Sequence, residues 1–281
     1  MREITVFTHR RAQDTRPTLE RLASAAAREG VTLRLDEEET RKHSLAPMPA
    51  IEEHAPVKDD VELCVVLGGD GTILRALERY ACTRVPVFSF NFGQIGFLAT
   101  VERQDIDEGI ERALKGDFEL LRLPAIVPEL PSGQQYAIND VAVHRKVGER
   151  VAEIAYALDD EVLGSVRCDG LVVATPAGST GYNLANGGPA MAWGVEGFIV
   201  SFIAPHSLTA RALVAAPADR LTIHNRSHRA LDVAVDGRAA GEIPPGGSLN
   251  ARFAGEVGTI AQLPDTSFYR RLREKFGRLA S

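Results

Sequence analysis

The sequence predicts two domains, an α/β domain with a Rossmann-like parallel sheet followed by a β-rich, sandwich-like domain. Over residues 1–123, short apolar runs alternate with amphipathic stretches, which is the pattern of parallel strands joined by helical crossovers. From 124 to 265, short apolar segments are separated by turn residues, which is typical of antiparallel strands. Residues 266–281 return to a helical period, and we expect this last helix to dock on the first domain.

Composition narrows the classes of function. The 281 residues are 44% hydrophobic and 25% charged, with a net charge of -6, which argues against nucleic acid as the main partner. No apolar stretch approaches the roughly 20 residues that span a bilayer, and the amino terminus lacks a signal-peptide core, so we expect no membrane partner. The cysteines, Cys64, Cys82 and Cys168, have no C-x-x-C spacing, so we expect a reducing, cytoplasmic location and no metal site of the protein's own.

In the first domain, each expected strand is an apolar run and each expected helix has one apolar face. The expected strands are Glu3–Phe7, Val31–Leu35, Leu63–Leu67 and Val85–Phe90, and the expected helices are Pro17–Arg28, Thr72 to about Cys82, and Asp105–Lys115. Gly30 and Gly116 are expected helix stops, and Asp105 with Glu108 resembles a capping box. The acidic stretch 36–60 has little periodicity, so we interpret it as a surface loop with solvated charges.

The first domain is organised around a glycine turn at the end of its most apolar strand. Gly68, Gly69 and Gly71 let backbone N–H groups approach a ligand closely, and Thr72 opens a helix whose amino terminus attracts phosphate. Asp70 is the anomaly, because a carboxylate in this place would repel a bound polyphosphate. A general base for a hydroxyl that attacks phosphorus belongs there, but so does an ordinary helix cap, and the turn alone leaves both interpretations open.

Three other segments have a clear pattern. Asn91–Leu98 is a second glycine-containing loop at the end of the neighbouring strand, and it can line the same pocket. Leu231, Val233 and Val235 alternate as in a half-buried strand, and the hairpin signal Asp236-Gly237 follows at once. The apolar face of the final helix is formed by Phe268, Leu272, Phe276 and Leu279.

A second group of polar candidates lies in the β-rich part. The turn Thr175–Thr180 is dense in hydroxyl and N–H groups that can hold ribose and phosphate oxygens, and Tyr182 offers a ring for stacking on a base. Asn139 and Asp140 stand between apolar strands, where an amide and a carboxylate suit a vicinal diol. A tight structural turn and a solvent-facing polar pair remain the alternatives.

Six stretches form an ordered set: GGDGT (68–72), NFGQIGFLA (91–99), IND (138–140), DGLVVATPAGSTGYNLANGGP (169–189), SFIAPHSLTARALV (201–214) and SFYRRLREKF (267–276). This set resembles the NAD kinase family, whose members phosphorylate the 2′-hydroxyl of the adenosine ribose of NAD to make NADP. GGDGT alone is also found in phosphofructokinases and diacylglycerol-type lipid kinases. The ordered set is more specific and spans most of the chain from about Leu63.

The resemblance implies an α/β domain, a β-sandwich-like domain that binds NAD, and a site between them, with Asp70 as the proton acceptor. The residues that match the phosphate-facing loop are Gly68, Gly69, Gly71 and Thr72. The residues that match NAD contacts are Asn139 and Asp140 for the ribose, Asp169 near the nicotinamide amide, and Thr180 and Tyr182 for adenine and ribose. Further candidates for binding the nucleotides are Arg75, Arg150, Arg167 and Ala185.

The implied reaction is phosphoryl transfer from ATP or inorganic polyphosphate, with Mg²⁺ carried by the donor, and the resemblance implies a homodimer or homotetramer. Several residues depart from the family pattern: Asp140 replaces a glutamate, Ala177 and Gly181 stand in a turn that usually reads TPTGSTAY, Ala212 replaces a proline, and Arg238 stands where glutamine is frequent. These departures affect substrate contacts and leave the choice between NAD and NADH open. The rival hypotheses are a lipid kinase with the same glycine turn and a dinucleotide-binding regulator without activity.

Overall fold

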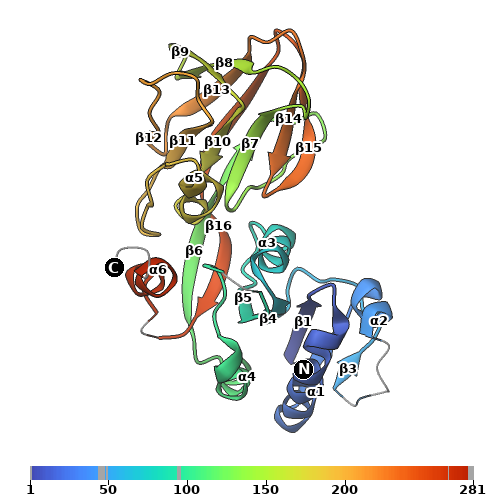
Figure 1. Ribbon diagram of the computed structural model, residues 1–281. Coiled ribbons are helices and arrows are strands. Elements are labelled where there is room, and N and C mark those ends of the chain that lie inside the picture. Colours follow the sequence, from blue (N-terminus) through green and yellow to red (C-terminus); the bar gives the residue numbers. More distant parts are fainter. Residues whose placement is uncertain (1, 44–47, 49, 94–95, 265, 278–281) are drawn as a thin grey trace. The chain divides into compact units, whose positions relative to one another are not determined.

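The chain divides into two compact units, described by a computed structural model over residues 2–43, 48, 50–93, 96–264 and 266–277. Unit 1 combines Met1–Arg122 with Gly258–Ser281, and unit 2 is the intervening Leu123–Val257. The chain leaves unit 1 within strand β6 (Glu119–Pro128) and returns within strand β16 (Ser248–Gln262), as Figure 1 shows.

Unit 1 contains a parallel sheet whose strands are the apolar runs of the sequence. In spatial order they are β3 (Ile51–Glu52), β2 (Val31–Arg34), β1 (Arg2–Thr8), β4 (Leu63–Gly68) and β5 (Val87–Asn91). The end of β16 adds a parallel neighbour to β5, where Ile260 is paired with Val87. The strand order changes direction between β1 and β4, and ligands of open α/β sheets bind outside the carboxyl ends of strands at such a point. The glycine turn follows β4 at this edge.

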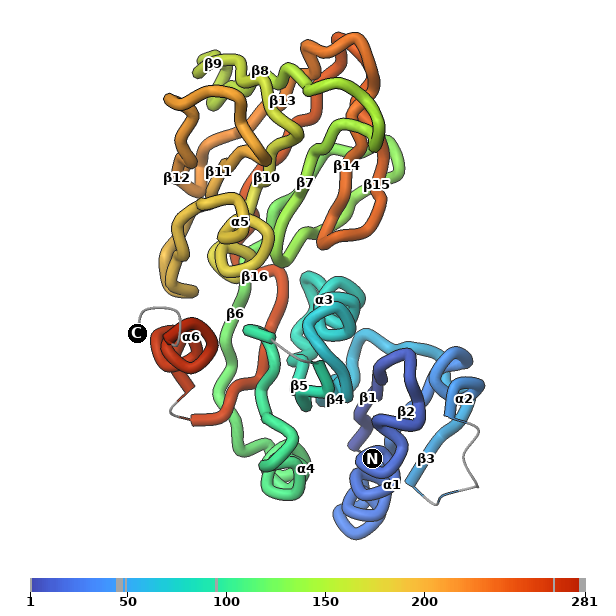
Figure 2. Tube along the Cα trace, viewed as in Figure 1, coloured from blue at the N-terminus to red at the C-terminus, as the bar shows by residue number. Residues whose placement is uncertain are grey.

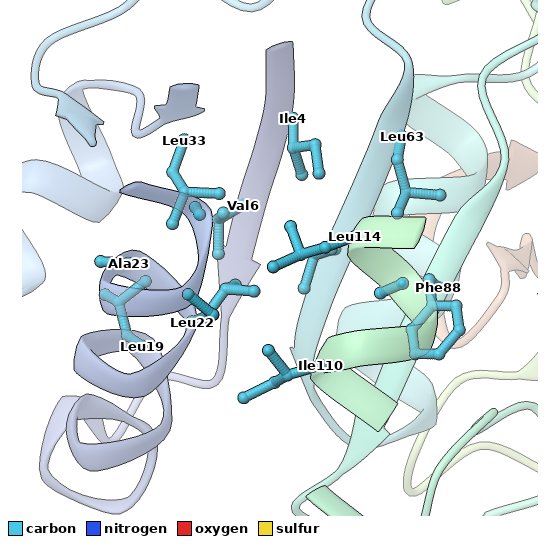
Figure 3. Packing of buried hydrophobic residues seen from close by; sticks show 14 of the residues in the cluster. Ile4, Val6, Leu19, Leu22, Ala23, Leu33, Leu63, Phe88, Ile110 and Leu114 are labelled. Atoms are coloured by element: carbon cyan, nitrogen blue, oxygen red, sulfur yellow. The ribbon is translucent and has the colours of Figure 1, made fainter. Parts of the chain in front are cut away.

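Helices pack on this sheet and fix it. They are α1 (Ala12–Glu29), α2 (Glu37–His43), α3 (Asp70–Arg79), α4 (Ile106–Lys115) and, at the end of the chain, α6 (Phe268–Phe276). Figure 3 shows Leu19 and Leu22 of α1 on the side of Val6 and Leu33, and Ile110 and Leu114 of α4 on the side of Phe88. All of these side chains belong to one buried cluster. Each such buried side chain stabilises the fold by roughly 1.5–3 kcal/mol, so the sheet that carries the glycine turn is a rigid base.

Unit 2 is a sandwich of antiparallel strands. One sheet has the order β12 (Leu213–Ala215), β11 (Phe198–Ile203), β10 (Gly170–Ala174), β7 (Asp140–Arg145), β14 (Leu231–Val235) and β15 (Arg238–Ile243). The other joins β16 to β13 (Arg220–Asn225), β8 (Ala152–Leu158) and β9 (Glu161–Cys168), and β6 also pairs with β16. Apolar side chains of both sheets form one buried core.

The predicted fold class is therefore confirmed, including the return of the last helix to the first unit. Figure 2 traces this return through β16 to α6, at the red end of the chain. The predicted hairpin is also present, because Asp236 and Gly237 have φ values of 46° and 74° between β14 and β15. Gly30 and Gly116 end their helices in the left-handed conformation, with φ values of 65° and 72°. Among the described residues, no helix has both the length and the apolar character needed to cross a bilayer.

The interpretation of residues 36–60 as a surface loop with solvated charges is wrong. This stretch contains α2 and β3, and the side chain of Glu39 is completely buried. Its carboxylate accepts hydrogen bonds from the backbone N–H and hydroxyl of Thr8 and from the ammonium of Lys42. The buried side chains of α2 are polar, so the helix lacks the apolar periodicity by which an amphipathic helix is recognised in a sequence. Residues 44–47 and 49 of this stretch lie outside the described residues.

The helices differ from the prediction in some of their ends and caps. Helix α1 begins at Ala12, five residues before Pro17. The capping box at Asp105 and Glu108 is wrong: a short 3₁₀ turn, η1 (Arg103–Asp105), precedes α4, and no side-chain cap bond forms there among the described residues. Leu279, which was predicted to lie on the apolar face of the last helix, is outside the described residues.

Candidate active site

The glycine turn is built by close approaches that exclude side chains. A Cβ atom on Gly68 would lie 2.7 Å from Cβ of Thr72, and one on Gly69 would lie 3.2 Å from Cα of Gly93 in the second glycine loop. Gly69 precedes α3 in an extended conformation, and Asp70 is the first helical residue. N–H groups in the first turn of a helix have no acceptor within the helix and attract anions. The turn therefore presents the backbone that a phosphate needs.

Asp70 does not cap α3. Its Oδ2 accepts a hydrogen bond from the backbone N–H of Phe97 at 3.0 Å, and its Oδ1 accepts one from Leu98 at 3.4 Å. A carboxylate has about four acceptor positions, so these two bonds orient the group and leave capacity for a third donor. Burial raises the pKa of Asp70, while the N–H groups of Phe97 and Leu98 and the charges of Arg271 and Lys275 oppose that rise. An oriented carboxylate with a raised pKa is well suited to accept a proton.

Gly96 makes this orientation possible. A Cβ atom on Gly96 would lie 2.5 Å from Oδ1 of Asp70, so only glycine fits beside the carboxylate. We expect Gly96→Ala to displace Asp70 and to lower kcat for phosphoryl transfer by roughly tenfold or more, because small misplacements of reacting groups are costly. Gly255→Ala is the matched control for adding a methyl group, since this exposed glycine lies outside the candidate site and nothing lies within 4 Å of its Cβ position. Steady-state kinetics of both variants checks this, and equal losses in the two would contradict it.

The second glycine loop lies beside the first. Asn91 ends β5, its Oδ1 accepts the N–H of Gly93 at 2.9 Å, and its Nδ2 donates to Glu102 at 2.8 Å. The approach of Gly93 to Gly69 joins the two loops at the carboxyl ends of β4 and β5. Gln94 and Ile95 of the predicted motif lie outside the described residues.

Arg75, a candidate phosphate contact, has other partners. Its guanidinium lies 3.3 Å from a carboxylate oxygen of Glu38 and 3.7 Å from one of Glu39, both on α2. The same group lies 5.9 Å from the ring centroid of Phe7. A phosphate that reached Arg75 would therefore compete with two carboxylates.

In unit 2, the Thr175–Thr180 turn and the Asn139-Asp140 pair lie in contact with each other. The N–H of Thr175 donates to the carbonyl of Asn139 at 2.9 Å, and its hydroxyl donates to the carbonyl of Ile138 at 2.6 Å. A Cβ atom on Gly178 would lie 2.0 Å from the carbonyl oxygen of Asn139, so the two segments are in direct contact. The side-chain Oδ1 of Asn139 is buried and makes no hydrogen bond within the part of the chain that the structure describes. Such an atom is a ready acceptor for a ligand hydroxyl.

Asp236 is a further candidate residue, which the sequence motifs do not reveal. Its carboxylate accepts three consecutive backbone N–H groups, from Ile138 at 2.9 Å, Asn139 at 2.8 Å and Asp140 at 3.0 Å. Burial, followed by the nearby charge of Asp236, raises the pKa of Asp140 to about 7. Burial likewise raises the pKa of Asp236 to about 6 against the opposing effect of its N–H donors. Aspartate is common in Asp-Gly hairpin turns for local reasons. The turn therefore explains the presence of Asp236 by itself, and its hydrogen bonds to residues 138–140 are not visible in the sequence.

The raised pKa of Asp140 predicts an effect of pH on the stability of the protein without ligand. Because the folded state binds the proton more tightly than the unfolded state, stability from Asp140 is present below pH 3.8 and is lost as the pH rises through about 7. Asp140→Asn removes this cost and should stabilise the protein at pH 8 by on the order of 2 kcal/mol, with less gain at pH 5. Thermal unfolding at both pH values measures this, with the exposed Asp160→Asn as control. Equal gains at the two pH values would argue against it.

The remaining candidates in unit 2 fall into two groups. Tyr182 is 37% exposed, and its ring stacks on His144 with centroids 5.9 Å apart. Burial raises the pKa of Tyr182, and the charges of Asp140 and Asp169 raise it further. Asp169 binds Arg145 at 2.5 Å, and this pairing lowers the pKa of Asp169.

The second group of candidates, Thr180, Ala185, Arg150 and Arg167, makes fewer contacts with the rest of the described residues. The hydroxyl of Thr180 donates to the carbonyl of Ala177 at 3.4 Å, and Thr180 is half-buried. Ala185 ends the short helix α5 (Tyr182–Ala185) with its side chain exposed, and Arg150 and Arg167 are exposed as well. These side chains lie open to a ligand or to solvent. No cluster of three metal-binding side chains occurs in the described part of the chain.

Two solved structures with this fold are kinases. A yeast NADH kinase complexed with NADH superposes with a TM-score of 0.87 at 20% identity, covering 100% of this chain and 89% of that one. An NAD kinase from Archaeoglobus fulgidus in complex with ATP superposes with a TM-score of 0.76 at 24% identity, covering 100% of this chain and 99% of that one. The fold is therefore that of this class of nucleotide kinases.

Sequence similarity identifies the family. Residues 7–118 match the model of the ATP-NAD kinase N-terminal domain, and residues 138–256 match that of the ATP-NAD kinase C-terminal domain. The NAD kinase of Gemmatimonas aurantiaca is 34% identical over 225 residues, which cover 77% of this chain and 78% of that protein. NAD kinase 2 of Streptomyces coelicolor is 34% identical over 260 residues, which cover 89% and 85%. The chain belongs to the ATP-NAD kinase family, as the ordered motifs predicted.

Proposed function

We propose that this enzyme of the ATP-NAD kinase family transfers a phosphoryl group from ATP or inorganic polyphosphate to the 2′-hydroxyl of the adenosine ribose of NAD, giving NADP. Unit 1 supplies the phosphate loop and the base, and unit 2 supplies the dinucleotide contacts. Family membership carries the overall activity and favours it over a lipid kinase or an inactive regulator. The observation that carries the chemistry is the carboxylate of Asp70, oriented by two N–H groups inside a loop suited to phosphate.

In the proposed step, the 2′-oxygen forms a bond to the terminal phosphorus of the donor. The bond between that phosphorus and the bridging oxygen breaks, and the shortened donor leaves with the electron pair. The hydroxyl proton moves to the carboxylate of Asp70. Base catalysis of this kind contributes roughly 10²- to 10⁴-fold, and positioning by the loop backbone contributes much of the rest.

Mg²⁺ is proposed to enter with the donor phosphates, which are its preferred partners together with water. When bound there, it neutralises charge that develops on the phosphate oxygens. The chain's own contribution is the first turn of α3, where Gly69, Asp70, Gly71 and Thr72 hold the loop open to an anion.

The dinucleotide is proposed to bind unit 2 through the ribose-facing pair Asn139 and Asp140, supported by Asp236. The buried Oδ1 of Asn139, which has no hydrogen-bond partner among the described residues, supports this placement, because such an acceptor is costly until a ligand supplies a donor. Asp169, Thr180, Tyr182 and Ala185 are proposed further contacts, with Arg75, Arg150 and Arg167 as candidates for the phosphates.

An activity matrix tests the function directly. The purified protein is assayed with NAD or NADH as acceptor and ATP or polyphosphate as donor, with and without Mg²⁺. We expect NADP or NADPH formation that requires a divalent cation. Absence of product in every combination, with a folded protein, would reject the proposal. We also propose a cytoplasmic homodimer or homotetramer, which light scattering and cell fractionation would check.

A further inference from the structure

Arg271 of α6 is a buried cation that binds the backbone of a loop. The residue is 8% exposed. Its Nη1 donates a hydrogen bond to the carbonyl oxygen of Phe97 at 2.7 Å and another to that of Ala99. Burying a guanidinium is costly unless its N–H groups are paired, so this contact is a specific one. It fixes the path of residues 97–99.

The same segment holds the carboxylate of Asp70. The N–H of Phe97 and the N–H of Leu98 both donate to Asp70. Residue 97 therefore binds Arg271 through its carbonyl and Asp70 through its N–H. The carbonyl of Phe97 and the N–H of Leu98 belong to the same peptide group, so a cation on that carbonyl polarises the group and strengthens the hydrogen bond from Leu98 to Asp70. The orientation of Asp70 thus depends on a side chain of the last helix.

Other contacts of α6 hold the same loop. The ring of Phe97 lies 5.3 Å from that of Phe276 and 6.5 Å from that of Phe268, centroid to centroid. Lys275 binds Glu102 at 3.1 Å, and Glu102 accepts from Asn91 at 2.8 Å. Helix α6 therefore contacts the 97–99 segment and also Glu102, the residue that binds Asn91 at the start of the second glycine loop.

We propose that Arg271 is a positioning residue for phosphoryl transfer, which holds the carbonyls of Phe97 and Ala99 so that the neighbouring N–H groups aim the carboxylate of Asp70. This inference rests on the proposed function, in which Asp70 is the base. Arg271 acts through the backbone of residues 97–99 and not by contact with a substrate.

The charges around Asp70 give the inference a pH signature. Burial raises the pKa of Asp70, and the N–H groups of Phe97 and Leu98 and the charges of Arg271 and Lys275 lower it. Glu102 and Glu274 are the acidic groups that, besides Asp70 itself, act on Arg271. Removing Arg271 weakens the hydrogen bonds to Asp70 and removes a positive charge, so the pKa of Asp70 rises further. A base must be deprotonated, so the acid limb of activity moves to higher pH.

The test compares Arg271→Met and Arg271→Lys in the full-length enzyme by pH profiles of kcat/KM for NAD. For Arg271→Met, we expect kcat to fall roughly tenfold and the acid limb to rise by roughly 0.5–1 pH unit. Arg271→Lys keeps the charge but not the planar fork, so it should lower kcat with a smaller shift of the limb. Arg270→Met is the matched control, because Arg270 is exposed on the same helix and binds Glu274 at 3.0 Å.

Hydrogen exchange gives a readout that does not depend on activity. In Arg271→Met, peptides covering residues 96–101 should exchange faster while those covering α6 stay protected. If α6 of Arg271→Met also loses protection against hydrogen exchange, that variant has disturbed the helix itself, and the kinetics of Arg271→Lys then test the inference. Two results would overturn the inference about Arg271 and leave the proposed function standing. One is a normal kcat with an unmoved acid limb in Arg271→Lys, and the other is an unmoved acid limb in an Arg271→Met enzyme whose α6 stays protected. An active Asp70→Asn enzyme overturns the assignment of the base and the inference with it.

Discussion

Asp70→Asn is expected to lower kcat for NADP formation by at least roughly 100-fold while the fold and NAD affinity remain close to those of the parent enzyme. The asparagine carbonyl can accept the stronger of the two hydrogen bonds, from Phe97 at 3.0 Å, while the bond from Leu98 at 3.4 Å is the weaker one to lose. The variant thus removes the proton acceptor with little change in structure. Steady-state kinetics, thermal unfolding and NAD titration measure the three quantities.

The control for Asp70→Asn is Asp14→Asn. Asp14 is also an acidic residue in the first turn of a helix of unit 1, but it is exposed. Loss of activity in Asp70→Asn alone would support the base assignment. Near-normal turnover in the Asp70→Asn enzyme would reject it, because positioning and charge neutralisation would then suffice without a base.

Asp236→Ala is expected to weaken NAD binding by at least tenfold and to lower the free energy of unfolding by about 3 kcal/mol. Truncation leaves the N–H groups of Ile138, Asn139 and Asp140 without their acceptor, and each orphaned buried donor costs roughly 1–3 kcal/mol. Relief of carboxylate burial offsets part of that cost. Asp236→Asn, which retains one acceptor oxygen and tolerates positive φ, should lie between the alanine variant and the parent.

Asp159→Ala is the matched control for the alanine variant. Asp159 has the same φ of 46° in a hairpin turn of the same unit, but it is exposed and accepts one backbone N–H, from Arg220 at 3.0 Å. It should cost about 1 kcal/mol or less and leave NAD binding unchanged. Chemical denaturation and NAD titration separate the two outcomes. Similar losses in both variants would show that the turn conformation, and not the three-fold acceptor, is what matters.

The strands were the most predictable part of the fold. Apolar runs such as Leu63–Leu67 are distinctive because a parallel strand is covered on both faces, and the alternation of Leu231, Val233 and Val235 marks a strand with one covered face. Helix α2 was not predictable in the same way. Its buried residues Glu39, Thr40 and His43 are polar, and the pairing of Glu39 and His43 with Thr8 depends on tertiary contacts that no local period reveals.

The site was predictable where chemistry and sequence neighbours coincide. Asp70 stood out because its charge conflicts with its glycine surroundings. Asp236 and Arg271 did not, since the groups that they bind are far away in the sequence. Asp236 acts on N–H groups 96 to 98 positions earlier, and Arg271 acts on carbonyls 172 and 174 positions earlier. An aspartate in a turn and an arginine on an amphipathic helix each have an ordinary local explanation. The local sequence therefore gives no reason to predict their long-range partners.

The split of unit 1 into Met1–Arg122 and Gly258–Ser281 has a consequence for the order of synthesis. A nascent chain on the ribosome presents Asp70 and its glycine turn long before Arg271 and the strand that pairs with β5 have been translated. Until then Val87 of β5 lacks its partner Ile260, and the loop at 97–99 lacks its anchor Arg271. Truncated products should therefore be caught by quality control as incomplete folds instead of persisting as partial enzymes, because the residues that complete unit 1 are translated only after the whole of unit 2.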